Sequence, residues 1–159
     1  MLNELLISDA AEPDPAAIAA LLEPFARRQI VLSRDEADIR HYLANFIVAE
    51  LGGELVGCVA VRNFGNQLFE LRSLVVRDDV HGLGVGSRLL SKACERLERL
   101  CPDGFRLFTL TLVPGFFEKS GFVKVGRDLF PEKIWCDCNN CPKLKYCDEV
   151  ALLYTSERS

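Results

Sequence analysis

The sequence has no long uninterrupted hydrophobic run and no excess of positive charge. Its 19 Lys and Arg against 23 Asp and Glu give a net charge of −4, which argues against a nucleic-acid partner because phosphate backbones are bound by clustered basic residues. No apolar stretch approaches the roughly 20 residues of a membrane span, so no membrane partner is expected. The opening MLNELLISDAAEPD lacks the basic segment and long apolar stretch of a signal peptide. We therefore expect a cytoplasmic protein.

Linkers and repeats are also missing. No low-complexity stretch and no internal repeat interrupts the 159 residues, so we expect one domain over 1–159. An apolar content of 49% with 26% charged residues is typical of a globular domain with one sizeable core. The sequence does not fix the assembly, and a homodimer is one of the states that it allows.

Cysteine, by contrast, is present seven times. Without an export signal we expect free thiols rather than disulfides. The CNNC spacing in the last part of the chain is typical of zinc knuckles. However, a second Cys-x-x-Cys pair is missing, and Cys136 and Cys138 are too close together in sequence for comfortable tetrahedral spacing. We favour reduced structural thiols and predict no metal. The group consists of Cys136, Cys138, Cys141 and Cys147.

Hydrophobic periodicity and turn residues predict the order of the elements. Strands are expected over 3–10, 46–64 (a hairpin around Gly52-Gly53), 67–77, 105–112, 122–130 and 149–156. Helices are expected over 13–28, 33–46, 85–100 and 114–122. Asp14 and Ser33 are the expected caps of the first two helices. This order predicts an α+β fold with a mixed central sheet flanked by helices.

The segment DDVHGLGVGSRLL places Gly82, Gly84 and Gly86 at the start of the helix 85–100. The first turn of a helix has unpaired N–H groups and a partial positive charge, so an anion can bind there where no bulky side chain intervenes. A phosphate cradle is one interpretation and a tight strand-to-helix turn is the other. The Lys-Ser/Thr pair of a P-loop is missing, and the segment lies too late in the chain for a dinucleotide fingerprint.

The same segment, VHGLGVGSRLL after a strand ending in LVV, resembles the acetyl-CoA loop of the GNAT acetyltransferase superfamily. The superfamily pattern Arg/Gln-x-x-Gly-x-Gly/Ala reads here as His81-x-x-Gly84-x-Gly86. FFEKSGF resembles the second signature, a short aromatic helix that ends in Gly-Phe. The resemblance covers nearly the whole chain. It implies the GNAT fold and an N-acetyltransferase, an acyltransferase that uses acetyl-CoA as co-substrate.

The resemblance also implies which residues bind acetyl-CoA. The backbone amides of the loop would hold the pyrophosphate, and the strand before it would pair with the pantetheine amides. His81 departs from the usual Arg or Gln and offers no guanidinium, while Arg88 either adds charge to the phosphates or is a solvated surface residue. The expected cofactor-binding residues are Leu74, Val75, Val76, His81, Gly82, Leu83, Gly84, Val85, Gly86, Ser87, Arg88 and Phe117.

A finer resemblance is to the short single-domain N-acetylglutamate synthases. It is carried by IVLSR, FELRSLVV and above all LFPEKIWCDCNNCPKLKYCDEVAL, which shares three of the grouped cysteines with that family. It implies that L-glutamate is the acceptor, that N-acetyl-L-glutamate for arginine biosynthesis is the product, and that attack is direct in a ternary complex. The shared cysteines fit a structural loop or a partial metal site.

Glutamate has two carboxylates, which require fixed cations, and the planar fork of arginine suits them. Arg72 lies among core-strand residues and is expected to reach the substrate, although a wet strand face is the alternative. Arg34 matches the arginine of the loop before the second helix in the resembling family, with a solvated first-turn position as the alternative. Lys119 is a weaker third cation, for which a surface position is the favoured alternative.

Glu70 is the expected general base, acting directly or through a water. The alternatives are an exposed strand residue or a partner of Arg72. Phe117 occupies the position where many relatives have a tyrosine near the sulfur, so the general acid is missing from its usual place.

Two other functions fit the same residues. One is acetylation of a different amine, such as another amino acid or a polyamine, which an acidic chain would suit. The other is a non-catalytic sensor of coenzyme A or a metal-binding interaction module. His81 and Phe117 leave this alternative open, because both depart from the residues usual in the superfamily.

Overall fold

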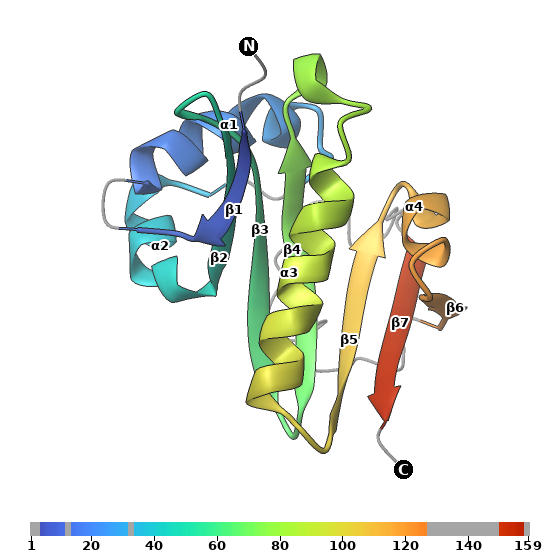
Figure 1. Cartoon of the computed structure of the whole chain (residues 1–159). Coiled ribbons are helices and arrows are strands. Elements are labelled where there is room, and N and C mark those ends of the chain that lie inside the picture. Colours follow the sequence, from blue (N-terminus) through green and yellow to red (C-terminus); the bar gives the residue numbers. More distant parts are fainter. Residues whose placement is uncertain (1–3, 12–13, 32–33, 127–149, 158–159) are drawn as a thin grey trace. The chain divides into compact units, whose positions relative to one another are not determined.

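The computed structural model describes residues 4–11, 14–31, 34–126 and 150–157 (Figure 1). Within these ranges the strands form a mixed sheet of order β1-β2-β3-β4-β5-β7-β6. The strands are β1 (Leu5–Asp9), β2 (Phe46–Leu51), β3 (Glu54–Gly65), β4 (Leu68–Val76), β5 (Gly104–Thr111), β6 (Val123–Val125) and β7 (Val150–Glu157). The helices are α1 (Pro15–Arg27), α2 (Glu36–His41), α3 (Val85–Leu100) and α4 (Pro114–Glu118). The predicted α+β fold with a mixed sheet and flanking helices is confirmed.

The chain packs as two compact units. The first combines Met1–Arg62 with Leu71–Pro102, and the second combines Asn63–Glu70 with Asp103–Ser159. The expectation of a single domain over 1–159 stays a prediction.

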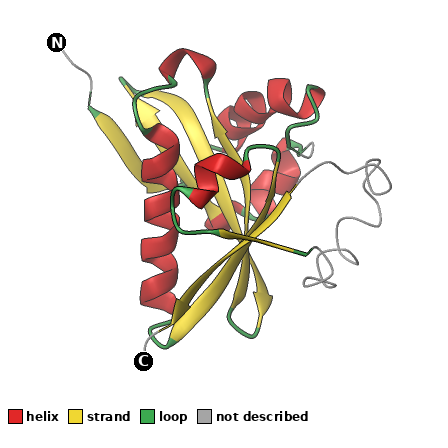
Figure 2. Ribbon diagram, turned by 90° about the vertical axis from the view of Figure 1, so that its right-hand side faces the viewer, coloured by secondary structure: helices red, strands yellow, loops and turns green. Residues whose placement is uncertain are grey.

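In the first unit, strands separate the long helix α3 from α1 and α2 (Figure 1 and Figure 2). Side chains alternate between the two faces of a strand. Phe46 and Val48 of β2 pack with Cys58 of β3 against Ile18 and other residues of α1 and α2. The intervening positions of β2 and β3 therefore face α3, whose buried stripe repeats at helical spacing. That stripe consists of Val85, Leu89, Leu90, Ala93 and Leu97.

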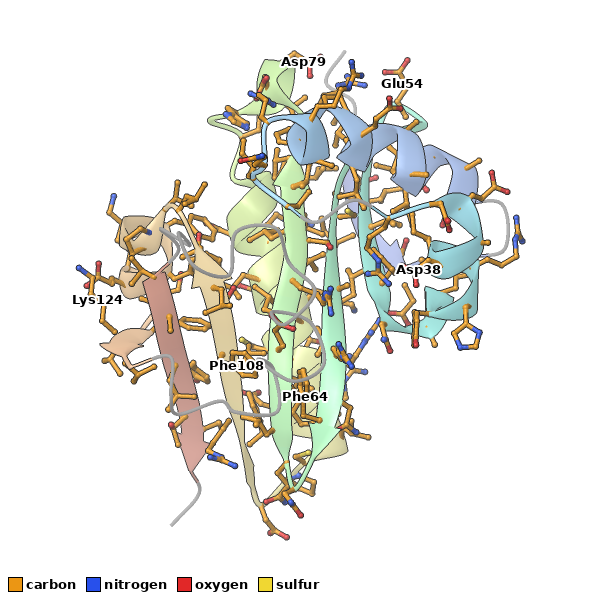
Figure 3. All side chains as sticks on the ribbon, turned by 180° about the vertical axis from the view of Figure 1, so that it is seen from behind. Asp38, Glu54, Phe64, Asp79, Phe108 and Lys124 are labelled. Carbon is orange, nitrogen blue, oxygen red and sulfur yellow. The ribbon has the colours of Figure 1, made fainter. Side chains whose placement is uncertain are left out.

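The second unit is built on β5 and β7, which pair antiparallel from Gly104 opposite Glu157 to Thr111 opposite Val150. β5 also pairs in parallel with the first residues of β4, from Leu68 opposite Arg106 to Glu70 opposite Phe108. The rings of Phe64 and Phe108 pack at an interplanar angle of 44° with their centroids 5.7 Å apart (Figure 3). This ring contact and the pairing of β4 with β5 hold the first residues of β4, including Glu70, in place.

Several predicted boundaries differ from the observed ones. The second helix starts at Glu36 rather than near Ser33, because Asp35 is the N-cap and its Oδ1 accepts a hydrogen bond of 2.8 Å from the Asp38 amide. Asp14 is the N-cap residue of α1, but its side chain does not cap that helix and instead accepts from the Ala11 amide at 2.7 Å. The strand predicted over 122–130 is observed as β6, Val123–Val125. Phe122 and Gly126 lie outside the strand, and residues 127–130 lie outside the described residues.

None of the helices in the described parts of the chain is long and apolar enough to cross a membrane.

Candidate functional site

The loop before α3 depends on glycine for its backbone conformation. Gly82 and Gly84 have φ values of 91° and 75°, in the left-handed region that other residues enter only with strain. A Cβ added at either position would meet nothing within 4 Å. Space outside the loop is therefore open, and glycine is required by the turn itself rather than by crowding from the protein. The loop is therefore a tight turn, and the phosphate cradle stays a prediction.

The first turn of α3 presents its N–H groups at this loop. Gly84 is the N-cap residue, and among the described residues no side chain caps the helix and no acidic residue lies in its first turn. The amides of Val85, Gly86 and Ser87 have no partner within the helix, whereas the Arg88 amide donates to the Gly84 carbonyl at 3.1 Å. These donors and the helix dipole form a site suited to an anion.

Charged side chains surround the loop. Arg77 donates from Nε to Asp79 at 2.6 Å and from Nη1 to Glu54 at 3.2 Å (Figure 3). These hydrogen bonds raise the pKa of Arg77, and the bond to Asp79 has the larger effect. The same bond lowers the pKa of Asp79. The ring of His81 is exposed, with Nε2 3.1 Å from the Val76 carbonyl oxygen. Arg88 and Leu83 are also exposed.

The strand segment before the loop is irregular. Ser73, within β4, has a φ of 55°, a left-handed conformation that interrupts the extended backbone. Its carbonyl oxygen accepts a hydrogen bond of 3.4 Å from the thiol of Cys58. Beyond this point Val75 is buried, and Leu74 and Val76 are half-buried. The residues expected to pair with pantetheine thus follow directly after a break in the strand geometry.

Arg34 is not a solvated residue, so that alternative is wrong. Its side chain is 9% exposed, and Nε donates to Asp38 Oδ2 at 2.6 Å. The guanidinium lies 4.9 Å from the centre of the Phe46 ring, a cation–π contact. Its charge also slightly opposes the effect of burial, which raises the pKa of the Cys58 thiol to about 12. Arg72, also in the first unit, is half-buried.

Three predicted site residues belong to the second unit. Glu70 is 2% exposed, so the alternative of an exposed strand residue is wrong. Phe117 is 3% exposed, and its ring packs edge-on against those of Phe116 and Phe122, with centroids 5.0 and 5.4 Å away. Lys119 at the end of α4 is exposed. Phe117 is therefore a core residue of this unit, and the role of Lys119 stays a prediction.

The cysteine group Cys136, Cys138, Cys141 and Cys147 lies outside the described residues. Within the described ranges, no group of three or more His, Cys, Asp or Glu side chains is arranged to hold a metal.

The sequence did not point to Gly57 or Ser73 as residues of this site. The available signal was a glycine in the interior of an apolar strand, which often marks close approach of another backbone.

Comparison with known proteins identifies the family. The family described as acetyltransferase (GNAT) domain matches residues 43–124. A relative from Chlorobaculum tepidum, described as an uncharacterized N-acetyltransferase, is 36% identical over 150 residues, which cover 94% of this chain and 95% of the relative. An amino-acid acetyltransferase of Neisseria meningitidis is 30% identical over 128 residues, which cover 79% of this chain but 29% of the relative.

Solved structures agree. The N-acetylglutamate synthase of Neisseria gonorrhoeae, complexed with coenzyme A and N-acetyl-glutamate, superposes with a TM-score of 0.85 at 26% identity, over 98% of this chain and 36% of that one. A Mycobacterium tuberculosis protein in complex with CoA gives a TM-score of 0.79 at 24% identity, over 95% and 99% of the two chains, and shows the shared fold. The chain spans about a third of the Neisseria proteins. It belongs to the GNAT acetyltransferase family and is an N-acetyltransferase that uses acetyl-CoA.

Proposed function

We propose that the chain transfers the acetyl group of acetyl-CoA to the α-amine of L-glutamate and so makes N-acetyl-L-glutamate for arginine biosynthesis in the cytoplasm. The observation that carries the proposal is the similarity, over 98% of this chain, to an N-acetylglutamate synthase complexed with coenzyme A and N-acetyl-glutamate. Amino-acid acetyltransferases among the sequence relatives support it.

The loop fits the phosphates of coenzyme A. Gly82 and Gly84 leave open space outside the turn, and the first-turn amides of α3 are uncapped by side chains of the described residues. We assign the pyrophosphate to the amides from Gly82 to Ser87, with Arg88 adding charge, and the pantetheine amides to Leu74–Val76. When bound, acetyl-CoA supplies the acetyl group as a thioester, from which thiolate is a fair leaving group.

The remaining roles concern the acceptor. We assign Glu70 as the base that takes a proton from the ammonium group of glutamate, directly or through a water, so that the amine becomes nucleophilic. Arg72 holds a carboxylate of the acceptor through its planar fork. Arg34 is the second carboxylate ligand and Lys119 the third cation, although Asp38 already engages Nε of Arg34. Attack is direct in a ternary complex and requires no acyl-enzyme, and Phe117 cannot donate a proton to the departing sulfur.

A second acceptor class, cationic amines, is favoured by two observations. The chain has a net charge of −4, and the charge of Arg34 is partly offset by Asp38. Polyamines or basic amino acids would gain from such surroundings, whereas glutamate would not.

An acceptor panel tests the proposal. Release of coenzyme A is measured with glutamate, glutamine, aspartate, lysine and spermidine at equal concentration. We expect glutamate to have the highest kcat/KM, because glutamine lacks one charge and aspartate is one methylene shorter. A preference for lysine or spermidine would refute the glutamate assignment and leave the acetyltransferase intact. Tight coenzyme A binding without turnover of any acceptor would instead favour a sensor.

A further inference from the structure

Three consecutive residues of β3 contact the segment from Ser73 to Arg77 in the first unit, which comprises the irregular end of β4 and the residue after it. The carbonyl oxygen of Val56 accepts a hydrogen bond of 2.8 Å from the Arg77 amide. A Cβ at Gly57 would lie 3.0 Å from the Val75 carbonyl oxygen. The thiol of Cys58 donates to the Ser73 carbonyl at 3.4 Å. Thus β3 touches β4 on both sides of the residues expected to pair with pantetheine.

Gly57 also faces α3, the helix that follows the glycine loop. The same added Cβ would lie 3.1 Å from Leu89 Cδ1 and 3.2 Å from Val85 Cγ1, both on the first turns of α3. Gly57 is not among the glycines with positive φ, so its backbone does not require glycine. Its small size is needed because β4 and α3 both approach it closely. The position therefore sets the separation between the strand and the start of the helix.

Cys58 acts on the opposite face of β3. It is fully buried among apolar residues of the first unit. Burial keeps the pKa of its thiol at about 12, so the group is a protonated donor at neutral pH. Its acceptor belongs to Ser73, whose left-handed backbone is otherwise strained. The S–H···O contact helps to hold that carbonyl in one direction, which fixes the direction of the peptide groups that follow.

We propose that Gly57 and Cys58 are positioning residues for acetyl-CoA: together they set the spacing and direction of the two elements that bind it. The inference rests on the proposed binding of pantetheine by Leu74–Val76 and of pyrophosphate by the loop. Neither residue touches the cofactor in this assignment. Both act through the backbone of β4, and Gly57 acts through α3 as well.

Coenzyme A titrations by calorimetry test the inference without any acceptor. A methyl group at Gly57 must displace a backbone carbonyl, so we expect Gly57→Ala to bind coenzyme A about tenfold more weakly. Cys58→Ala loses the donor and should bind about threefold more weakly, while Cys58→Ser keeps a donor and should recover most of the wild-type affinity. Ile18→Val is the matched control. It trims the buried core of α1 and should lower the melting temperature by about 2–4 °C with unchanged affinity.

The outcomes separate this inference from the proposed function. Wild-type protein that does not bind coenzyme A would overturn both. A folded Gly57→Ala variant with wild-type affinity would overturn the positioning role alone. The positioning role is also overturned if Ile18→Val weakens coenzyme A binding as much as Gly57→Ala does, because the loss would then reflect general destabilisation of the core. If Gly57→Ala does not fold, the cysteine pair decides: wild-type affinity in Cys58→Ala, or no recovery in Cys58→Ser, would refute the role of the thiol.

Discussion

Replacing Gly84 by aspartate should abolish most of the affinity for coenzyme A, and asparagine provides a control of equal size. Gly84 has φ 75° and ψ 20°, a left-handed conformation that Asp and Asn both tolerate better than other side chains. A Cβ there meets nothing within 4 Å. Both variants therefore carry a similar strain of about 1–2 kcal/mol and no clash, and they differ by one charge.

That charge decides the magnitude. Two unit charges 4 Å apart repel by about 1 kcal/mol in water and about 4 kcal/mol at a protein surface. Gly84 is exposed, so we expect an intermediate loss of about 2–3 kcal/mol, roughly 30- to 150-fold in Kd, for Gly84→Asp relative to Gly84→Asn. Calorimetric titration gives the two Kd values, and thermal unfolding checks that both variants fold alike. Equal affinities in the two variants would refute the assignment of the pyrophosphate to this loop.

Three further predictions concern the substrate, the thiols and metal. Arg72→Ala should lower kcat/KM for glutamate by roughly 30- to 1000-fold, with little recovery in Arg72→Lys; unchanged glutamate turnover would remove Arg72 from the site. Burial raises the pKa of the Cys58 thiol from 9.0 to about 12, so the unfolded chain loses this proton first as the pH rises. The contribution of the protonated thiol to the free energy of unfolding is therefore complete below pH 9. It is lost between pH 9 and about 12, by up to about 1.4 kcal/mol per pH unit. Urea unfolding at stepwise pH should show this slope in the wild type and a shallower one in Cys58→Ala. Elemental analysis of protein purified without added metal should give well under one zinc or iron per chain, and a stoichiometric, chelator-resistant metal would contradict this.

Much of the fold follows from local pattern. The pair Gly52-Gly53 between two apolar stretches predicted the hairpin of β2 and β3. The expected alternation does not correspond to one buried and one exposed face, because consecutive residues of both strands are buried. The predicted helix over 85–100 coincides with α3, since its apolar residues recur at helical spacing and the glycines stand at its start. Helix α2 was placed less well. Ser33 and Asp35 both suit an N-cap, and the sequence does not say which of the two begins the helix.

The backbone conformation around the candidate site could be predicted where it depends on residue type, because Gly82 and Gly84 adopt φ values that favour glycine. It could not be predicted where it depends on a contact between distant positions. Ser73 gives no sign of a left-handed backbone, because its conformation depends on β3, fifteen residues away at Cys58. The burial of Arg34 likewise arises from packing of the segment before α2 against Phe46 of β2, although its partner Asp38 is a neighbour in sequence.

The buried thiol on β3 has a consequence for oxidation chemistry. Peroxide and disulfide reagents attack the thiolate form of cysteine. A thiol with a pKa of about 12 is ionised in roughly one molecule in 100,000 at pH 7, and Cys58 is also sealed from solvent. Oxidants that consume exposed thiols should therefore leave the Cys58–Ser73 contact intact, so the strand beside the loop keeps its geometry when the redox balance of the surroundings shifts.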